Sequence, residues 1–353
     1  MGEDGHNDFP IWIRAFYNNH IYQRNFSGDI PLYGQVDFPR LAKGGLRGQF
    51  WSVYVECPKI NDIYSDEDYF EIGRDTLQQI DLVNRLVAAN PEQLQLVNSI
   101  TEFRDVFHHH ATRIASFMGI EGLHQIVNSA SILRLYHRLG VRYATLTHEC
   151  HNKYADSATP PEPLHNGLSE NGKVLVREMN RLGMAVDLAH VSYKTMLDVL
   201  EISRAPVMFS HSSAYALCAH ERNVPDDVLW KVKMNNGIVM ISFYPQYTRC
   251  DDPAKADLSD VADHIQYVGE LIGYEHVGLG SDFDGMPKGI IGLEDVSKYP
   301  DLIAELLRCG LSVKQIAGVI GWNVVRVMEG VERVAEEMRA ELPLEDDVKP
   351  FFD

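Results

Sequence analysis

The chain has 353 residues, of which 45% are hydrophobic, and its 50 Asp and Glu outnumber its 32 Lys and Arg to give a formal net charge of -18. This acidity excludes a nucleic acid as the expected partner, because a polyanion requires a basic surface. No apolar run reaches about 18 residues, so we expect no membrane span. The length suits one large α/β barrel.

The first predicted element ends in DGHNDFP at residues 4–10, which places His6 and Asp8 two residues apart. Residues with this spacing share a face of an extended strand, although a capped turn before Pro10 is the alternative. Few residues precede the pair, so we expect the first strand to be truncated at the amino terminus. Neither a signal peptide nor a hydrophobic tail for a lipid anchor is visible, which leaves the compartment open.

Apolar runs of strand length then alternate with helical stretches. Further strands are predicted at 48–57, 113–122, 141–148, 184–190, 206–212, 237–245 and 276–283. Helices are predicted at Asp66–Ala89, 125–139, 169–182, 193–203, 225–235 and 259–272, followed by a helical C-terminal third. Together with the strand that ends near His6, this pattern contains eight strands separated by helices.

Eight alternating strand and helix units predict a closed parallel sheet. We therefore expect a single (β/α)8 TIM barrel over residues 1–353, with extra helices at the C-terminus. A doubly wound open sheet is the alternative, but no G-x-G-x-x-G follows the first strand. The long, proline-rich loop 151–168 suggests a flap over one end of the barrel.

Residues with metal-binding or proton-transfer chemistry follow the predicted strands at their carboxyl ends. This edge is where barrel enzymes build their active sites. The candidates are His6, Asp8, Glu121, His148, His190, His211 and Asp282.

Each candidate also has a purely structural interpretation. His190 or His211 alone is typical of a hydrogen-bonded core histidine, and Asp282 and Asp284 could form a turn before Gly285. Taken together, several histidines and carboxylates without partners at a barrel mouth would be costly, and a bound metal would remove that cost. The number of ligands indicates two metal ions about 3.5–4 Å apart that share a hydroxide, with Glu121 as the bridge. Imidazole and carboxylate ligands suit Zn²⁺.

Two other features carry less information. The HHH run at 108–110 falls on a predicted helix, where consecutive side chains point in different directions, so we interpret it as exposed surface. The five cysteines form no C-x-x-C, which argues against a thiolate zinc site. Their number allows two disulfides and one free thiol, or five free thiols. The sequon Asn25-Phe26-Ser27 fits a secreted protein.

Several motifs in one order resemble the membrane (renal) dipeptidase family of zinc peptidases, peptidase family M19. They extend over nearly the whole chain, and the wording around HNKYADS and LSENGK is closer to fungal or bacterial members. The motifs are DGHNDFP, GQFWSVYVEC, GIEGLH, GVRYATLTHEC, MNRLGMAVDLAHVS, RAPVMFSHSSAYALC, RNVPDDVL, GLGSDFDG and GLEDVSKYPDLIAELL.

The resemblance implies a metallo-dependent hydrolase barrel that holds two zinc ions and cleaves free dipeptides, as a homodimer. It assigns the metal ligands to His6, Asp8, the bridging Glu121, His190 and His211. The remaining implied roles are steadying of the oxyanion by His148, a clamp on the substrate carboxylate by Arg222, general acid and base chemistry by Asp282, and a substrate contact by Tyr247.

The resemblance also implies disulfides Cys57–Cys150 and Cys218–Cys250, with Cys309 free. The cysteine that links subunits in animal members has no counterpart here, so we expect a non-covalent dimer. If the amino terminus is trimmed and the disulfides form, we expect a secreted or lumenal compartment; otherwise we expect a cytoplasmic one.

Two alternative functions remain. One is a binuclear zinc amidohydrolase that acts on a lactam, a lactone or an N-acyl amino acid, and the other is a catalytically silent binding protein. Arg222 argues against a neutral substrate, and the retained ligands and Asp282 argue against a silent protein. Dipeptides of the Cys-Gly type or with a D-residue are candidate substrates.

Overall fold

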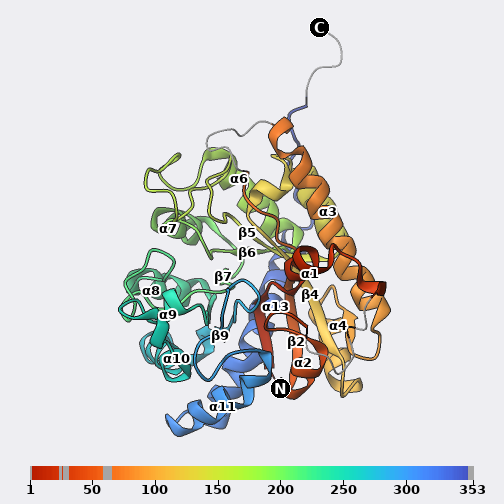
Figure 1. The fold of residues 1–353 in the computed structure, drawn as a ribbon. Helices are drawn as coiled ribbons and strands as arrows, with labels where there is room; N and C mark the ends of the chain where they lie inside the picture. Colours follow the sequence, from red (N-terminus) through yellow and green to blue (C-terminus); the bar gives the residue numbers. More distant parts are fainter. Residues whose placement is uncertain (1, 24–25, 27–31, 59–65, 349–353) are drawn as a thin grey trace.

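The computed structural model describes residues 2–23, 26, 32–58 and 66–348. Its centre is a parallel sheet of eight strands in the order β1-β2-β4-β5-β6-β7-β8-β9, surrounded by helices (Figure 1). The strands are β1 (Gly2–Asn7), β2 (Leu46–Ser52), β4 (Ile114–Glu121), β5 (Val141–Thr145), β6 (Ala185–Asp187), β7 (Met208–Phe209), β8 (Ile238–Ile241) and β9 (Val277–Leu279). The predicted (β/α)8 barrel is confirmed.

The first and last strands meet and nearly close the ring. Asn7 bridges Phe283 in parallel, and the Asp8 amide donates to the Phe283 carbonyl at 2.8 Å. The buried Asp4 carboxylate accepts hydrogen bonds from the Ser281 amide and hydroxyl at 2.8 and 2.6 Å, and from the Tyr299 hydroxyl at 2.8 Å. These bonds fix β1, which has six residues, against the chain that follows β9.

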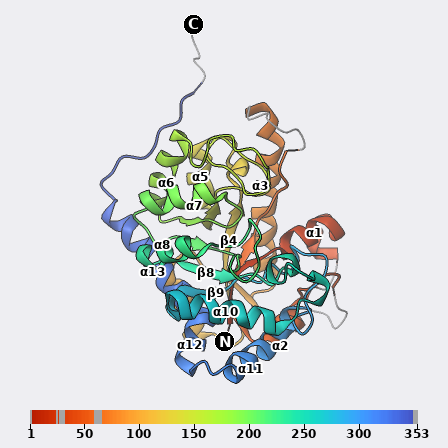
Figure 2. The ribbon, with the colours of Figure 1, turned by 90° about the vertical axis from the view of Figure 1, so that its left-hand side faces the viewer.

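The helices cover the outside of the sheet (Figures 1 and 2). Those between the strands are α1 (Phe9–Tyr17), η1 (Ile21–Gln23), α2 (Phe38–Gly44), α3 (Asp66–Ala89), α4 (Ile100–His109), η2 (Leu123–Ile126), α5 (Ala130–Arg138), α6 (Glu170–Leu182), α7 (Tyr193–Ile202), α8 (Asp226–Asn235), α9 (Pro245–Thr248), η3 (Pro253–Lys255), α10 (Leu258–Ile272) and η4 (Tyr274–His276). The predicted C-terminal helices are η5 (Val296–Lys298), α11 (Tyr299–Arg308), α12 (Val313–Ala317), η6 (Gly318–Trp322) and α13 (Asn323–Glu337).

Two predictions about local structure need correction. The helix predicted at 125–139 is broken, because Val127 and Asn128 adopt positive φ angles of 53° and 56° and α5 starts afresh after the Ser129 cap. A short strand, β3 (Leu94–Leu96), pairs with β4 outside the ring, and its three residues give too short an apolar run to be recognised.

Both expected disulfides are present, joining Cys57 to Cys150 and Cys218 to Cys250, and the half-buried Cys309 is free. Among the described residues, no helix is both long and apolar enough to cross a membrane. His108 and His109 are exposed, as interpreted from the sequence, whereas His110 follows the end of α4 and is half-buried. Asn25 and Ser27 of the sequon lie outside the described residues.

Glu3 in β1 is 5% exposed, and its Oε2 has no hydrogen-bond partner in the described structure. Burial, together with the neighbouring Asp4, raises the pKa of Glu3 from 4.5 to about 8. The unfolded chain therefore ionises Glu3 near pH 4.5, whereas the folded protein keeps it protonated until about pH 8, so this residue destabilises the fold increasingly between those values.

We predict that Glu3→Gln raises the free energy of unfolding by on the order of 2–3 kcal/mol at pH 8 and has little effect at pH 4.5. Urea unfolding at both pH values measures this difference. The matched control is Glu201→Gln, on the exposed side of α7. An equal pH dependence for wild type and Glu3→Gln would contradict the prediction.

Candidate metal centre and substrate pocket

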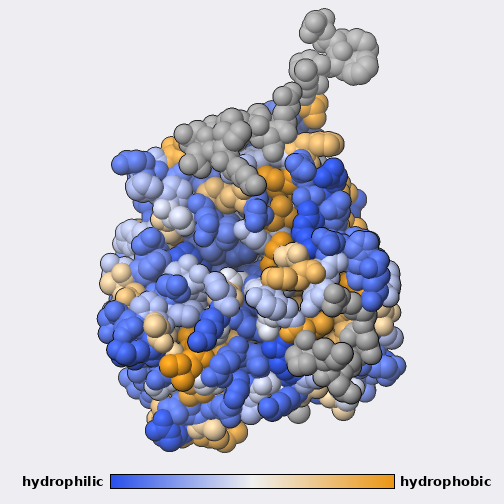
Figure 3. All heavy atoms as spheres, viewed as in Figure 1, coloured by the Kyte–Doolittle hydropathy of each residue, from blue (hydrophilic) through white to orange (hydrophobic). Residues whose placement is uncertain are grey.

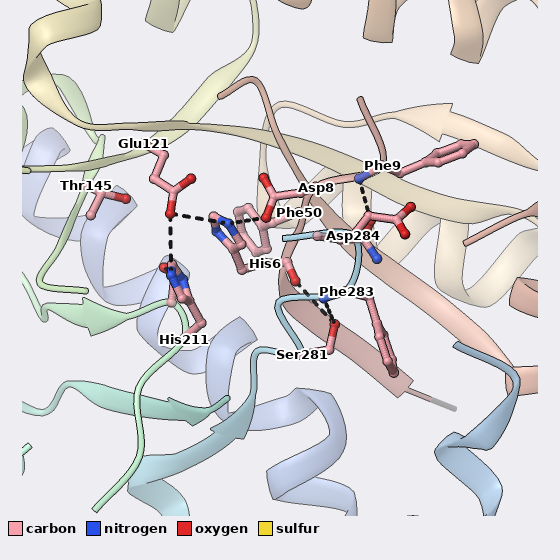
Figure 4. Close-up of polar contacts among 12 residues, drawn as sticks. His6, Asp8, Phe9, Phe50, Glu121, Thr145, His211, Ser281, Phe283 and Asp284 are labelled. Carbon is pink, nitrogen blue, oxygen red and sulfur yellow. Dashed lines mark hydrogen bonds and ion pairs between the residues drawn. The ribbon is translucent and has the colours of Figure 1, made fainter. Parts of the chain in front are cut away.

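The candidate ligands converge at the carboxyl ends of the barrel strands. His6 lies in β1 and Glu121 ends β4, while His190 and His211 follow β6 and β7. Figure 4 shows the Glu121 carboxylate between the His6 and His211 rings, with Asp8 on the far side of His6. Strands that are distant in sequence therefore deliver one buried group of side chains.

One carboxylate oxygen is at the centre of this group. Glu121 Oε1 lies 3.0 Å from His190 Nε2, 3.4 Å from His211 Nε2 and 3.6 Å from His6 Nε2. His6 Nε2 is also 3.2 Å from Asp8 Oδ2, and the Nε2 atoms of His190 and His211 are 2.9 Å apart. A neutral imidazole ring has only one N–H proton, so hydrogen bonds alone cannot pair all of these nitrogen and oxygen atoms. Lone pairs that face one another in this way are typical of a metal site.

These side chains form overlapping ligand sets. The ligand atoms of His6, Asp8 and Glu121 all lie within 4.8 Å of one another, as do those of Glu121, His148 and His190. Glu121 belongs to both sets. Asp282 forms a further set with His6 and His211.

The electrostatics also suit divalent cations. Burial raises the pKa of Glu121 well above its usual value, and burial together with Asp8 raises that of Asp282 to about 8. Burial lowers the pKa of His190 and His211 well below 6.5, which keeps both rings neutral and able to donate a lone pair. Burial also lowers the pKa of the His6 ring, but the charges of Asp8 and Glu121 outweigh this effect and raise the pKa to about 10. The neutral imidazoles of His190 and His211 and the crowded carboxylates around His6 are a donor set that fits zinc, which would replace the proton on His6.

Asp187 orients His211 through Ser210. The Ser210 hydroxyl donates its proton to Asp187 Oδ2 at 2.6 Å, and its oxygen also lies 2.9 Å from His211 Nδ1. Because its only proton is already donated, the hydroxyl oxygen accepts the proton on His211 Nδ1. This leaves the lone pair on His211 Nε2, which faces Glu121. The Thr145 hydroxyl and the Ser210 amide also donate to Asp187, at 2.5 and 2.7 Å. Sequence analysis missed Asp187, although its place at the end of β6, three residues before His190, is a usable signal.

Tyr143 contacts Nδ1 of His6, as Ser210 contacts Nδ1 of His211. Its hydroxyl lies 2.7 Å from His6 Nδ1 inside the barrel. A Cβ at Gly119 on the neighbouring β4 would collide with the Tyr143 ring, so only glycine lets the ring occupy this place. This pair of residues, distant in sequence, was also missed, because no local motif joins them.

Three residues at the centre adopt left-handed backbone conformations, which are energetically costly for residues other than glycine. The φ angles are 64° for His190, 63° for Asp282 and 65° for Asp284. The loop 151–168 helps to hold both His190 and His148, because the Ala158 amide donates to the His190 carbonyl at 2.8 Å and the Ser157 hydroxyl donates to the His148 carbonyl at 2.6 Å. Strain of this kind concentrates at functional sites.

A pocket of about 250 Å³ opens beside the centre. Its polar lining and size suit a small, charged molecule. The lining residues are Asp8, Ile11, Tyr54, Glu121, His148, Glu149, His190, Tyr244, Tyr247, Asp282, Asp284 and Gly285.

The predicted substrate residues lie in or next to this pocket. His148 lines it and packs against Tyr54 and His190, with ring centroids 4.8 and 4.5 Å apart, and its buried Nδ1 has no partner in the described structure. Arg222 does not line the pocket but stacks on Tyr247, which does, with its guanidinium carbon 5.1 Å from the ring centroid. Arg222 is only 3% exposed, and its Nε and Nη1 find no partner among the described residues.

A parallel eight-stranded barrel with buried histidines and carboxylates at its carboxyl edge defines a metal-dependent hydrolase. Sequence comparison gives the family: residues 3–342 match the sequence profile of "Membrane dipeptidase (Peptidase family M19)", and the chain belongs to this family. The chain is therefore a dipeptidase of a metallopeptidase family.

Fungal dipeptidases are among its similar relatives. Dipeptidase aclJ of Aspergillus oryzae is 63% identical over 350 residues, covering 99% of this chain and 82% of that protein. Dipeptidase tcpJ of Claviceps purpurea is 50% identical over 348 residues, covering 99% and 81%.

Solved structures agree with the fold. A metallo peptidase from Rhodobacter sphaeroides, liganded with a phosphinate mimic of the dipeptide L-Ala-D-Ala, superposes with a TM-score of 0.83 at 25% identity, covering 94% of this chain and 99% of that chain. The M19 metallo peptidase dipeptidase AC has a TM-score of 0.83 at 26% identity, covering 94% and 98%.

We predict that Asp187→Asn weakens zinc binding by about 10–100-fold, because the amide cannot accept all the hydrogen bonds that orient Ser210 and His211. Competition with a chromophoric chelator measures the affinity, and circular dichroism checks the fold. Ser210→Ala should show a loss of similar size. The matched control is Ser212→Ala, a buried serine near His211 whose hydroxyl has no partner in the described structure. Equal affinities for Asp187→Asn and wild type would contradict this role.

Proposed function

We propose that the protein hydrolyses free dipeptides with two zinc ions that Glu121 bridges. The observation that carries this proposal is the single Glu121 oxygen within 3.6 Å of the Nε2 atoms of three histidines. In this proposal, His6 and Asp8 complete one metal position, and His190 and His211 complete the other. Zinc bound there supplies a Lewis acid for the scissile carbonyl and an activated water as nucleophile.

Asp282 and His148 handle the proton and the developing charge. Cations held by the neighbouring ligands would offset the burial that raises the pKa of Asp282, so that its ionised carboxylate, in the pocket and close to His6 and His211, could take a proton from the water and pass it to the leaving amine. Burial lowers the pKa of His148 well below 6.5, so its ring is neutral and donates one hydrogen bond to the carbonyl oxygen as negative charge develops.

Recognition of both substrate ends sets the length. The unpaired donors of Arg222 bind the substrate carboxylate beside Tyr247, and the carboxylates of Asp282 and Asp284, which line the pocket, attract the free amine. A buried arginine with unused donors favours a substrate with a carboxylate over a lactam or lactone. An amidohydrolase acting on an N-acyl amino acid is the second candidate, and the free amine distinguishes the two substrates.

The finer specificity belongs to the same proposal. The structural relative bound to a mimic of L-Ala-D-Ala supports a test of dipeptides with a D-residue at the second position, beside Cys-Gly. We also propose an oxidising compartment, secreted or lumenal, which the two disulfides support. The non-covalent homodimer remains a prediction.

We predict two zinc ions per chain for protein purified without chelators and equilibrated with zinc. Elemental analysis should give two for wild type and fewer than two for Glu121→Gln, because the amide cannot bridge as a carboxylate does. Glu149→Gln is the matched control, since Glu149 lines the pocket without belonging to a ligand set in the described structure. One ion or none in wild type would contradict the two-metal proposal.

We predict that Arg222→Lys raises KM for Ala-Ala at least about tenfold with a smaller change in kcat, because a point charge replaces a planar fork. Steady-state kinetics should also show that wild type prefers Ala-Ala to its N-acetylated, C-amidated and tripeptide forms. With the amidated dipeptide, wild type and Arg222→Lys should differ little. Equal turnover of free and blocked peptides would overturn recognition of both ends.

A further inference from the structure

Three aromatic side chains form a cluster on the surface beside the pocket; we name Trp12, Phe16 and Tyr33 the rim cluster. Their ring centroids lie 4.6 Å apart for Trp12 and Phe16, 4.4 Å for Phe16 and Tyr33, and 5.2 Å for Trp12 and Tyr33. Phe16 is 48% exposed and Tyr33 is 62% exposed. Figure 3 shows apolar surface at the position that α1 occupies in Figure 1. The Trp12 and Phe16 rings are stacked and the Tyr33 ring is tilted against both, so the cluster presents aromatic surface to solvent.

Asp284 joins the rim cluster to the pocket. Trp12 Nε1 donates a hydrogen bond to the Asp284 carbonyl, which anchors α1. The Gln35 amide donates to Asp284 Oδ1 at 2.5 Å and the Asp284 amide donates to Gln35 Oε1 at 2.7 Å, which anchors the segment that carries Tyr33. Since Asp284 itself lines the pocket, both parts of the cluster are fixed to the pocket wall.

The cluster adjoins the end of the pocket that holds carboxylates. Ile11, the neighbour of Trp12 in α1, lines the pocket together with Asp8, Asp282 and Asp284. A Cβ on Gly285 would collide with the carboxylate of Asp282 and lie 2.5 Å from that of Asp8, so these two side chains and the Asp284 turn are in immediate contact. Under the proposed function, this end receives the free amine of the substrate.

We propose that the rim cluster is a subsite for the side chain of the amino-terminal residue of the dipeptide, and that it selects large aromatic or apolar side chains. This inference rests on the proposed function and deepens it. The three rings do not line the pocket themselves, but a side chain that leaves the pocket past Ile11 and Asp284 would meet Trp12, whose ring is stacked on Phe16. Charged residues hold the backbone of the substrate, and the rings outside select its side chain.

The test compares kcat/KM for Ala-Gly, Trp-Gly and Gly-Trp in the zinc-loaded enzyme and in the double variant Phe16→Ala/Tyr33→Ala. Both side chains are exposed, so the variant should fold, and thermal unfolding verifies this. We expect wild type to prefer Trp-Gly to Ala-Gly, and the double variant to lose about tenfold on Trp-Gly, the size of one or two aromatic contacts, with Ala-Gly and Gly-Trp nearly unchanged. The matched control is Trp230→Ala, an exposed aromatic residue on α8 that should alter none of the three values.

An equal loss on Ala-Gly and Trp-Gly would overturn the subsite, as would a loss confined to Gly-Trp. Reduced self-association of the double variant in sedimentation, with unchanged selectivity, would assign the cluster to contacts between copies instead and overturn it too. Failure of wild type to cleave any dipeptide would overturn the proposed function and the subsite with it. In all the other outcomes wild type cleaves dipeptides, so they overturn the subsite alone.

Discussion

The site depends on one constraint: a buried carboxylate oxygen must face three imidazole nitrogens at once. Glu121 ends β4, and the rings that meet it come from β1 and from the segments after β6 and β7. A parallel barrel satisfies this constraint because its strands all end at the same edge. The hydrogen bonds behind the rings then decide which nitrogen of each ring faces Glu121.

Rigidity at this edge comes from groups that do not touch the pocket. Asp187 ties β5, β6 and β7 together through the Thr145 hydroxyl and the Ser210 amide and hydroxyl. Asp4 performs the equivalent task between β1 and the chain after β9. Both carboxylates accept several hydrogen bonds, which offset part of the cost of burying them, although burial still raises the pKa of Asp4. The barrel thus uses buried carboxylates for support as well as for its candidate metal centre.

The sequence predicted the barrel and the convergence of candidate ligands because strand ends carry a local signal. Apolar runs followed by His, Asp or Glu indicated which residues share an edge, and α3 was predicted with its observed bounds. Contacts between distant residues were beyond that reasoning. The Tyr143 bond to His6 depends on the missing side chain of Gly119, and the break before α5 depends on two positive φ angles. The place of Arg222 beside Tyr247 was expected only from family resemblance, since neither spacing nor periodicity joins them.

The closure of the barrel between its first and last strands has a consequence for folding. His6 lies in the first strand of the barrel, and the pairing of that strand is completed by Ser281 and Phe283, which follow the last strand. Contacts between residues so far apart in sequence form late and slowly, because the whole intervening chain must be ordered first. The candidate centre therefore assembles only after nearly all of the barrel has been synthesised, so a partly made chain cannot hold its metals in the native arrangement.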